Sequence, residues 1–207
     1  MFLRTAGLLC AAALAAGLPN PARAHDAGAH DPSKAAKAPP GSVQLRLADT
    51  LLRDQDGREL RLRSDVLGKR VAVVNFVYTT CTTVCPVSSA TLAQLQERLG
   101  ARLGTQVQLV SITVDPLRDT PARLKEYSAR HEAGGGWLWL TGSKANVDAA
   151  LKAFGAYTPN PEDHPAMTLV GDLEGARWTR LYGFPSADEL LAQVERALAL
   201  RVARHSH

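Results

Sequence analysis

The sequence predicts an α/β sandwich built on a mixed β-sheet. Two apolar runs rich in β-branched residues, 71–78 and 107–114, are typical of strands buried on both faces. A segment with helical spacing of apolar residues follows the first run, and a helix-capping residue with a proline follows the second. A pair of strand-like runs and a final helical segment close the chain. This alternation of strands and helices, followed by a hairpin and a helix, favours an α/β fold with a mixed sheet.

The elements are expected in a definite order. Alternating runs at 44–48 and 59–62 flank the turn dipeptide Asp56-Gly57 and predict an N-terminal β-hairpin. The strand at 71–78 should lead through a turn at 79–86 into a helix at 87–103. Later elements are expected as a strand at 107–114, a helix from Asp119 or Thr120 to about Arg130, a strand at 137–140, a helix from Ser143 to Phe154, strands at 166–170 and 178–182, and a helix after Ser186.

The amino-acid composition limits the classes of protein to which this chain can belong. The 207 residues are 45% hydrophobic and 21% charged, which suits one domain with a sizeable core. No apolar run reaches the roughly 20 residues that a membrane-spanning helix needs, which excludes a multi-pass membrane protein. A formal net charge of +4 and an aromatic content of 5% do not favour a nucleic-acid partner.

The first 24 residues have the pattern of a secretory signal peptide. Arg4 supplies the positive end, residues 6–18 form a short apolar region, and Ala22-Arg23-Ala24 is a small-x-small cleavage site. We therefore expect export to the periplasm and loss of Cys10 with the cleaved segment; the alternative is an uncleaved membrane anchor. The expected organisation is a signal peptide at 1–24, a flexible leader at 25–41, a folded domain at 42–202 and a frayed tail at 203–207.

The remaining cysteines, Cys81 and Cys85, mark the candidate site. Their C-x-x-x-C spacing falls where a buried strand leads into a helix, and positions four apart share one helix face. The free N–H groups and positive dipole end of a helix N-terminus favour thiolate, the form that binds metal or attacks a disulfide. Two thiolates suit Cu(I), zinc or a redox couple, and one structural disulfide is the alternative.

His164 is the candidate for a third ligand. It lies between Pro161 and Pro165 in a loop before a strand, and loops beside strand ends are common places for sites. With Cys81 and Cys85 it would complete a three-coordinate site, with Asp163 as a supporting partner. The alternative is an exposed histidine without a function.

These residues resemble the Sco/SenC family of thioredoxin-fold copper proteins. The resemblance rests on three stretches: 75–86 with both cysteines, 114–121 (VDPLRDTP), and Asp163-His164. It implies a thioredoxin-like three-layer sandwich, and it implies copper, as Cu(I) or Cu(II), bound by Cys81, Cys85 and His164. The sequence departs from the family pattern at Thr82 and Thr83, where Pro and an acidic residue are common, and at Pro165, where Ser or Thr is common.

The resemblance also implies a function and a partner. It indicates a periplasmic metallochaperone that supplies copper or reducing equivalents to the CuA-bearing subunit of cytochrome c oxidase, or to another periplasmic copper or thiol protein. The alternative is a metal-independent thiol–disulfide oxidoreductase, in which Cys81 attacks and Cys85 resolves. A thiol peroxidase and a pure interaction module explain fewer of these features.

Overall fold

The computed structural model describes residues 41–175 and 177–206. The expected signal peptide and nearly all of the expected leader lie outside these residues.

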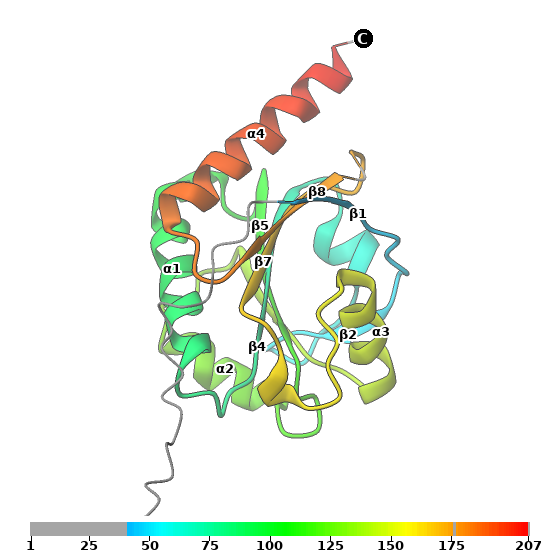
Figure 1. Ribbon diagram of the computed structural model, residues 1–207, viewed down its shortest axis with the longest axis vertical. Coiled ribbons are helices and arrows are strands. Elements are labelled where there is room, and N and C mark those ends of the chain that lie inside the picture. The colour runs from blue at the N-terminus through cyan, green and yellow to red at the C-terminus, as the bar shows by residue number, and fades with distance from the viewer. Residues whose placement is uncertain (1–40, 176, 207) are drawn as a thin grey trace, which may run out of the picture. The chain divides into compact units, whose positions relative to one another are not determined.

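A six-stranded sheet of order β1-β8-β7-β4-β5-β6 forms the centre of the domain, and β2 and β3 pair separately (Figure 1). The strands are β1 (Gly41–Gln44), β2 (Leu51–Arg53), β3 (Glu59–Arg61), β4 (Val71–Val77), β5 (Val107–Thr113), β6 (Trp137–Leu140), β7 (Met167–Gly171) and β8 (Arg177–Tyr182). The helices are α1 (Val84–Leu99), α2 (Pro121–Ala129), α3 (Lys144–Phe154) and α4 (Ala187–His205), with short helical turns at η2 (Leu62–Leu67), η3 (Gly100–Arg102) and η4 (Pro161–Asp163).

The sheet is mixed, as the sequence predicts. Strands β4, β5 and β6 are parallel, and Val73 lies opposite Leu109 in their register. Strand β7 runs antiparallel to β4, and β8 and β1 continue the antiparallel half. The carboxyl ends of β4, β5 and β6 therefore meet the amino end of β7 at one edge of the sheet. This edge carries the loops that contain the candidate site residues.

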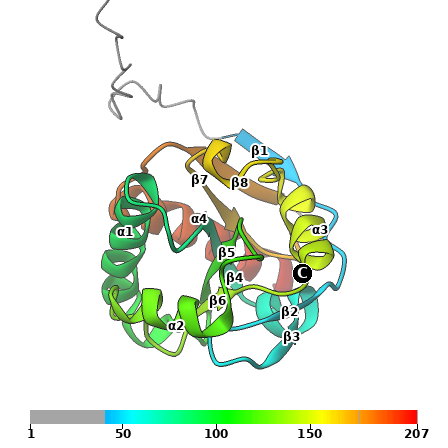
Figure 2. The same ribbon diagram turned by 90° about the horizontal axis from the view of Figure 1, so that it is seen from below.

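Side chains of β4 alternate between two cores, because successive residues of a strand point to opposite faces. Val71, Val73 and Val77 pack in a cluster with residues of α1, α2 and α4. Val74 and Phe76 pack in a second cluster with residues of α3, the β2–β3 hairpin and η2. Figure 2 shows the resulting three layers, with α1 and α2 on one side of the sheet and α3 and the hairpin on the other.

Local signals fix three helix starts as expected. The Thr120 side chain caps α2 by accepting from the Arg123 N–H, and Pro121 occupies the first helical position. Ser143 caps α3 in the same way. Ser186 forms a reciprocal capping box with Glu189 at the start of α4.

The main differences from the predicted boundaries concern the hairpin and two helices. The first arm of the hairpin is Leu51–Arg53 rather than 44–48, because the buried Leu52 is the residue that pairs with Leu60 across the turn. Helix α1 begins at Val84 rather than at residue 87. Helix α4 continues through His205, so residues 203–205, expected to be frayed, are helical. In the residues that the structure describes, no helix is long and apolar enough to cross a membrane.

Candidate functional site

Cys81 and Cys85 lie where the sequence places them, between the central strand β4 and helix α1. Cys81 belongs to the connecting turn, where its N–H donates to the Tyr78 carbonyl, and Cys85 lies in the first turn of α1. Both are free thiols and both are buried, with exposed fractions of 5% and 1%. The neighbouring Thr82 and Thr83 are exposed, so the thiol pair lies just beneath the surface at the carboxyl edge of the sheet.

The sulfur of Cys81 acts as the cap of α1. The N-cap residue, Thr83, makes no side-chain capping bond. Instead, the backbone N–H of Cys85 donates to the Cys81 Sγ at 3.3 Å. The next position is Pro86, which has no N–H that needs a partner. The helix start therefore holds the two cysteines together and directs a backbone dipole at the first sulfur.

The two thiols differ in acidity. Burial alone would raise the pKa of Cys81, but hydrogen bonds from the Cys85 thiol and from the backbone at Cys85 and Thr83 lower it below its usual value. A hydrogen bond from the Tyr78 phenol adds to this lowering. Burial raises the pKa of Cys85 well above its usual range, and the hydrogen bond to Cys81 raises it further. The pair therefore favours a thiolate at Cys81 beside a protonated Cys85.

His164 is a buried histidine with unpartnered ring nitrogens. Its backbone is extended, with φ −67° and ψ 133°, as expected for a residue that precedes a proline. The residue is 7% exposed, and neither Nδ1 nor Nε2 has a hydrogen-bond partner. Burial lowers its pKa, which favours the neutral imidazole, the form that binds metals. Buried polar atoms are rarely left unpaired, so both nitrogens of this ring are free to accept a partner.

Tyr78 connects the histidine to the thiol pair. Its ring packs edge-on against the His164 ring, with centroids 5.8 Å apart and an interplanar angle of 84°. Its phenol hydrogen-bonds with Cys81, as described above. In residues 41–175 and 177–206, however, no three His, Cys, Asp or Glu side chains lie close enough together to hold a metal ion. The structure thus brings Cys81 and Cys85 into contact and places His164 one aromatic ring away.

Asp119 supports the cysteine loop from the loop that follows the neighbouring strand β5. Its carboxylate accepts from the Thr79 N–H at 3.2 Å and from the Thr79 hydroxyl at 2.6 Å. It also accepts from the Thr113 hydroxyl, so it joins the turn after β4 to the end of β5. Burial raises the pKa of this carboxyl group even though these hydrogen bonds oppose the rise. The sequence predicts only a possible helix start at Asp119, although the residue lies in the stretch 114–121 that carries part of the family resemblance.

Two charged side chains near the candidate site are largely exposed. The Asp163 side chain is exposed and makes no hydrogen bond to the His164 ring. Arg118 is paired with Asp115 at 3.4 Å, and its side chain is 66% exposed.

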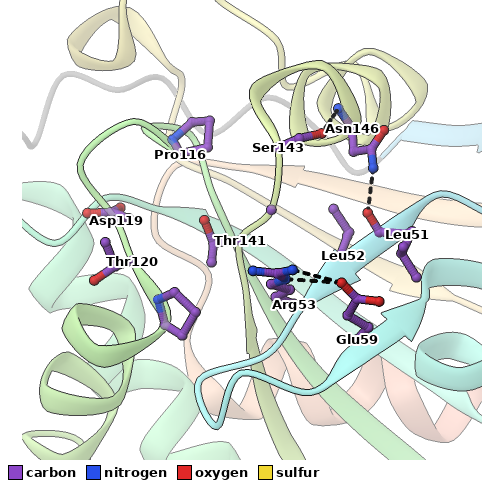
Figure 3. Close-up of a pocket in the computed structure, with 12 residues that line it drawn as sticks. Leu51, Leu52, Arg53, Glu59, Pro116, Asp119, Thr120, Thr141, Ser143 and Asn146 are labelled. Carbon is purple, nitrogen blue, oxygen red and sulfur yellow. Dashed lines mark hydrogen bonds and ion pairs between the residues drawn. The ribbon is translucent and has the colours of Figure 1, made fainter.

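A cavity of about 470 Å³ lies beside Asp119 at the carboxyl ends of β5 and β6 (Figure 3). Its walls include Thr141, Pro116 and the paired side chains of Arg53 and Glu59, which face each other across 2.8 Å. Neither cysteine nor His164 lines it. Asp119 is therefore shared between this cavity and the support of the cysteine loop.

The fold and the site together define a thioredoxin-like protein with a C-x-x-x-C thiol pair at the carboxyl edge of its sheet. The SCO1/SenC family model matches residues 49–199. The chain belongs to this family.

Known proteins support this assignment. The SCO1 protein homolog of Bacillus subtilis is 36% identical over 112 residues, which are 53% of this chain and 56% of that protein. The chain spans about half the length of the curated relatives that it matches first. BsSco, a member of the Sco family of cytochrome c oxidase assembly proteins in which a disulfide switch has been identified, has a TM-score of 0.65 and 28% identity, covering 77% of this chain and 97% of its own. Yeast Sco1 with copper bound has a TM-score of 0.63 and 27% identity, covering 77% and 95%.

Proposed function

We propose that this protein is a periplasmic copper carrier in which Cys81, Cys85 and His164 bind the metal as cargo. The observation that carries the proposal is the His164 ring, which is buried with both nitrogens unpartnered and packs on the Tyr78 side chain that contacts Cys81. Two thiolates and a neutral imidazole are ligands that suit Cu(I). Yeast Sco1, a structural neighbour, holds copper in its solved structure.

The route of delivery follows from the family. Members such as BsSco are cytochrome c oxidase assembly proteins. We propose the CuA-bearing subunit of that oxidase as the recipient of the copper, or of reducing equivalents. The signal-like first 24 residues support export to the compartment where such a recipient is exposed.

A Cu(I) titration of the reduced full chain against a chromophoric chelator tests the ligand assignment. We expect one tightly held Cu(I), with affinity lowered about tenfold or more in His164→Ala, because removal of one of three ligands leaves a two-coordinate site. His205→Ala, which changes an exposed histidine at the end of α4, is the matched control and should bind as the unmodified chain does. Equal affinity of His164→Ala and the unmodified chain would show that the imidazole is not a ligand.

Thiol–disulfide exchange is the second candidate, and the opposite pKa shifts of the two cysteines favour it. In this reaction the Cys81 thiolate attacks a disulfide of the partner and releases one partner sulfur as a thiolate, which takes up a proton. Cys85 then loses its proton and attacks Cys81. The protein ends with a Cys81–Cys85 disulfide, and the partner ends with two thiols.

Trapping of the mixed disulfide tests this candidate without metal. Incubation of the chelator-treated Cys85→Ser variant with a disulfide-bonded substrate should accumulate a covalent adduct on Cys81, visible by mass spectrometry. Cys81→Ser should accumulate far less, because burial keeps Cys85 protonated. An adduct that forms equally in both variants contradicts the assignment of Cys81 as the attacking sulfur.

A further inference from the structure

A second concave site lies at the opposite end of the sheet from the cysteines. A groove of about 550 Å³ is formed by β7, β8, Ser42 of β1 and the carboxyl half of α4. It includes Val170 and Gly171 at the carboxyl end of β7, and because β7 runs antiparallel to β4, this end is far from Cys81. Figure 1 shows the last turns of α4 extending beyond the sheet beside β8 and β1.

Hydrogen-bond donors dominate the groove. Three arginines line it, Arg177 from β8 and Arg196 and Arg204 from α4, together with the Gln193 amide and the Thr179 and Ser42 hydroxyl groups. Asp172 is the acidic residue of the lining, which gives three guanidinium groups against one carboxylate and a formal net charge of +2.

Two of these arginines have no ionic partner. Among the described residues, Arg177 and Arg196 form no salt bridge, and Arg196 donates only to the Gln193 amide oxygen at 3.1 Å. Both side chains belong to exposed residues, so their charge is available to a ligand that enters the groove.

The third arginine, Arg204, is held in place by a buried carboxylate. Asp172 is 4% exposed, and it accepts from the Arg204 Nη2 at 2.6 Å and from the Gly175 N–H. A Cβ at Gly175 would lie 2.7 Å from Arg204 Nη1, and a Cβ at Gly171 would lie 2.7 Å from the Arg177 carbonyl oxygen. Gly175 therefore leaves room for the Arg204 guanidinium, and Gly171 lets the β8 backbone and the Trp178 ring pack closely against β7. The buried Asp172 carboxylate fixes one guanidinium before any ligand binds.

We propose that this groove binds the phosphate group of an anionic ligand. Guanidinium groups match phosphate oxygens with paired N–H donors, and two uncompensated positive charges balance a phosphate dianion. Three guanidiniums from two elements, with an amide and hydroxyl groups, can surround the several oxygens of one phosphate. Leu200 and Ala197 line the same groove and offer an apolar surface to the carbon part of a phosphate ester.

Two probes test the proposal and separate its sources. Sodium phosphate is titrated into the full chain at constant ionic strength and followed by the backbone amide NMR signals of residues 171, 175 and 193. In parallel, vesicles of phosphatidylglycerol and of phosphatidylcholine are sedimented with the protein. The double variant Arg177→Gln/Arg196→Gln removes the unpaired charges, and Arg46→Gln changes an exposed arginine outside the groove. All variants keep the same first 40 residues, so a difference in binding between them is caused by the change in the groove.

We expect saturable shifts with phosphate that weaken about tenfold or more in the double variant and are unchanged in Arg46→Gln. Stronger sedimentation with phosphatidylglycerol, lost in the double variant, identifies a lipid headgroup as the phosphate source; its absence identifies a soluble phosphate ester. The proposal is overturned if neither probe binds, or if the double variant binds both probes as the unmodified chain does.

Discussion

Tyr78 is the residue that connects the two parts of the candidate site. It ends the apolar run of the central strand, so β4 fixes its position, and its side chain contacts both the Cys81 thiol and the His164 ring. Burial raises its own pKa well above the usual range, which keeps the phenol a proton donor. The phenol stabilises the Cys81 thiolate, whereas the ring orients the imidazole.

Two variants of Tyr78 distinguish the role of its phenol from the role of its ring. Tyr78→Phe removes the donor to Cys81 and keeps the ring, so alkylation of Cys81 by iodoacetamide at pH 7 should slow by about two- to tenfold while Cu(I) affinity changes little. Tyr78→Ala removes both, so Cu(I) affinity should fall as well, because His164 loses the ring against which it packs. Tyr182→Phe changes an exposed tyrosine of β8 and is the control. Weakened Cu(I) binding in Tyr78→Phe itself would show that the phenol, not the ring, supports the metal ligands.

At the residue scale, the sequence predicts which side chains carry the chemistry better than it predicts which of them are in contact. Cys81 and Cys85 are four positions apart at a strand-to-helix junction, and this local spacing is enough to predict two adjacent sulfurs. His164 is some 80 positions away, so its place beside Tyr78 depends on the pairing of β7 with β4, which no local pattern encodes. The contact of Asp119 with Thr79 is non-local in the same way.

Among the elements, the loops after β4 and β5 form one unit because Asp119 joins them. A carboxylate with three hydrogen-bond donors is well satisfied, but its burial raises its pKa above the usual value. The folded protein therefore holds the Asp119 proton more tightly than the unfolded chain does. The stability that this group contributes is present below its unfolded pKa and is lost as pH rises through its folded pKa.

Asp119→Asn tests this linkage, because an amide resembles the protonated acid in shape and charge. We expect the free energy of unfolding of the unmodified chain to fall relative to Asp119→Asn as pH rises from about 3.5 to 7. Urea denaturation of both proteins across this range measures the difference. Asp163→Asn, which changes an exposed carboxyl group, serves as the control. A difference that stays constant with pH, or that changes in the opposite direction, contradicts a raised pKa for Asp119.

The hairpin shows where the prediction of elements fails. Residues 44–48 alternate as a strand does, and the turn at Asp56-Gly57 is correct, but the chain pairs Leu52 with Leu60 across that turn. Leu52 is fully buried against α3 and the sheet, whereas residues 45–50 lie outside the strands. Alternation identifies a segment that can form a strand, but burial of Leu52 selects the one that pairs.

For the whole molecule, the mixed sheet separates two kinds of chemistry. Parallel β4, β5 and β6 bring the thiol pair and Asp119 to one edge, and the antiparallel β7 and β8 bring the arginine groove to the other. The fold class and the strands 71–78 and 107–114 are predicted from the sequence because long apolar runs are strong local signals. The sheet order is not, because it follows from pairings such as β1 with β8 that join the two ends of the domain.

Strand β1 is therefore expected to stabilise the whole domain although it has only four residues. Val43 lies opposite Trp178 and packs against the core cluster, and β1 covers the backbone edge of β8. A chain lacking residues 1–44 should lose about 2–3 kcal/mol of unfolding free energy in urea relative to one lacking residues 1–40, which keeps β1. The bare edge of β8 should also promote association, visible by light scattering, because unpaired strand edges recruit other chains. Equal stability and equal scattering of the two truncated chains would show that β8 does not need β1.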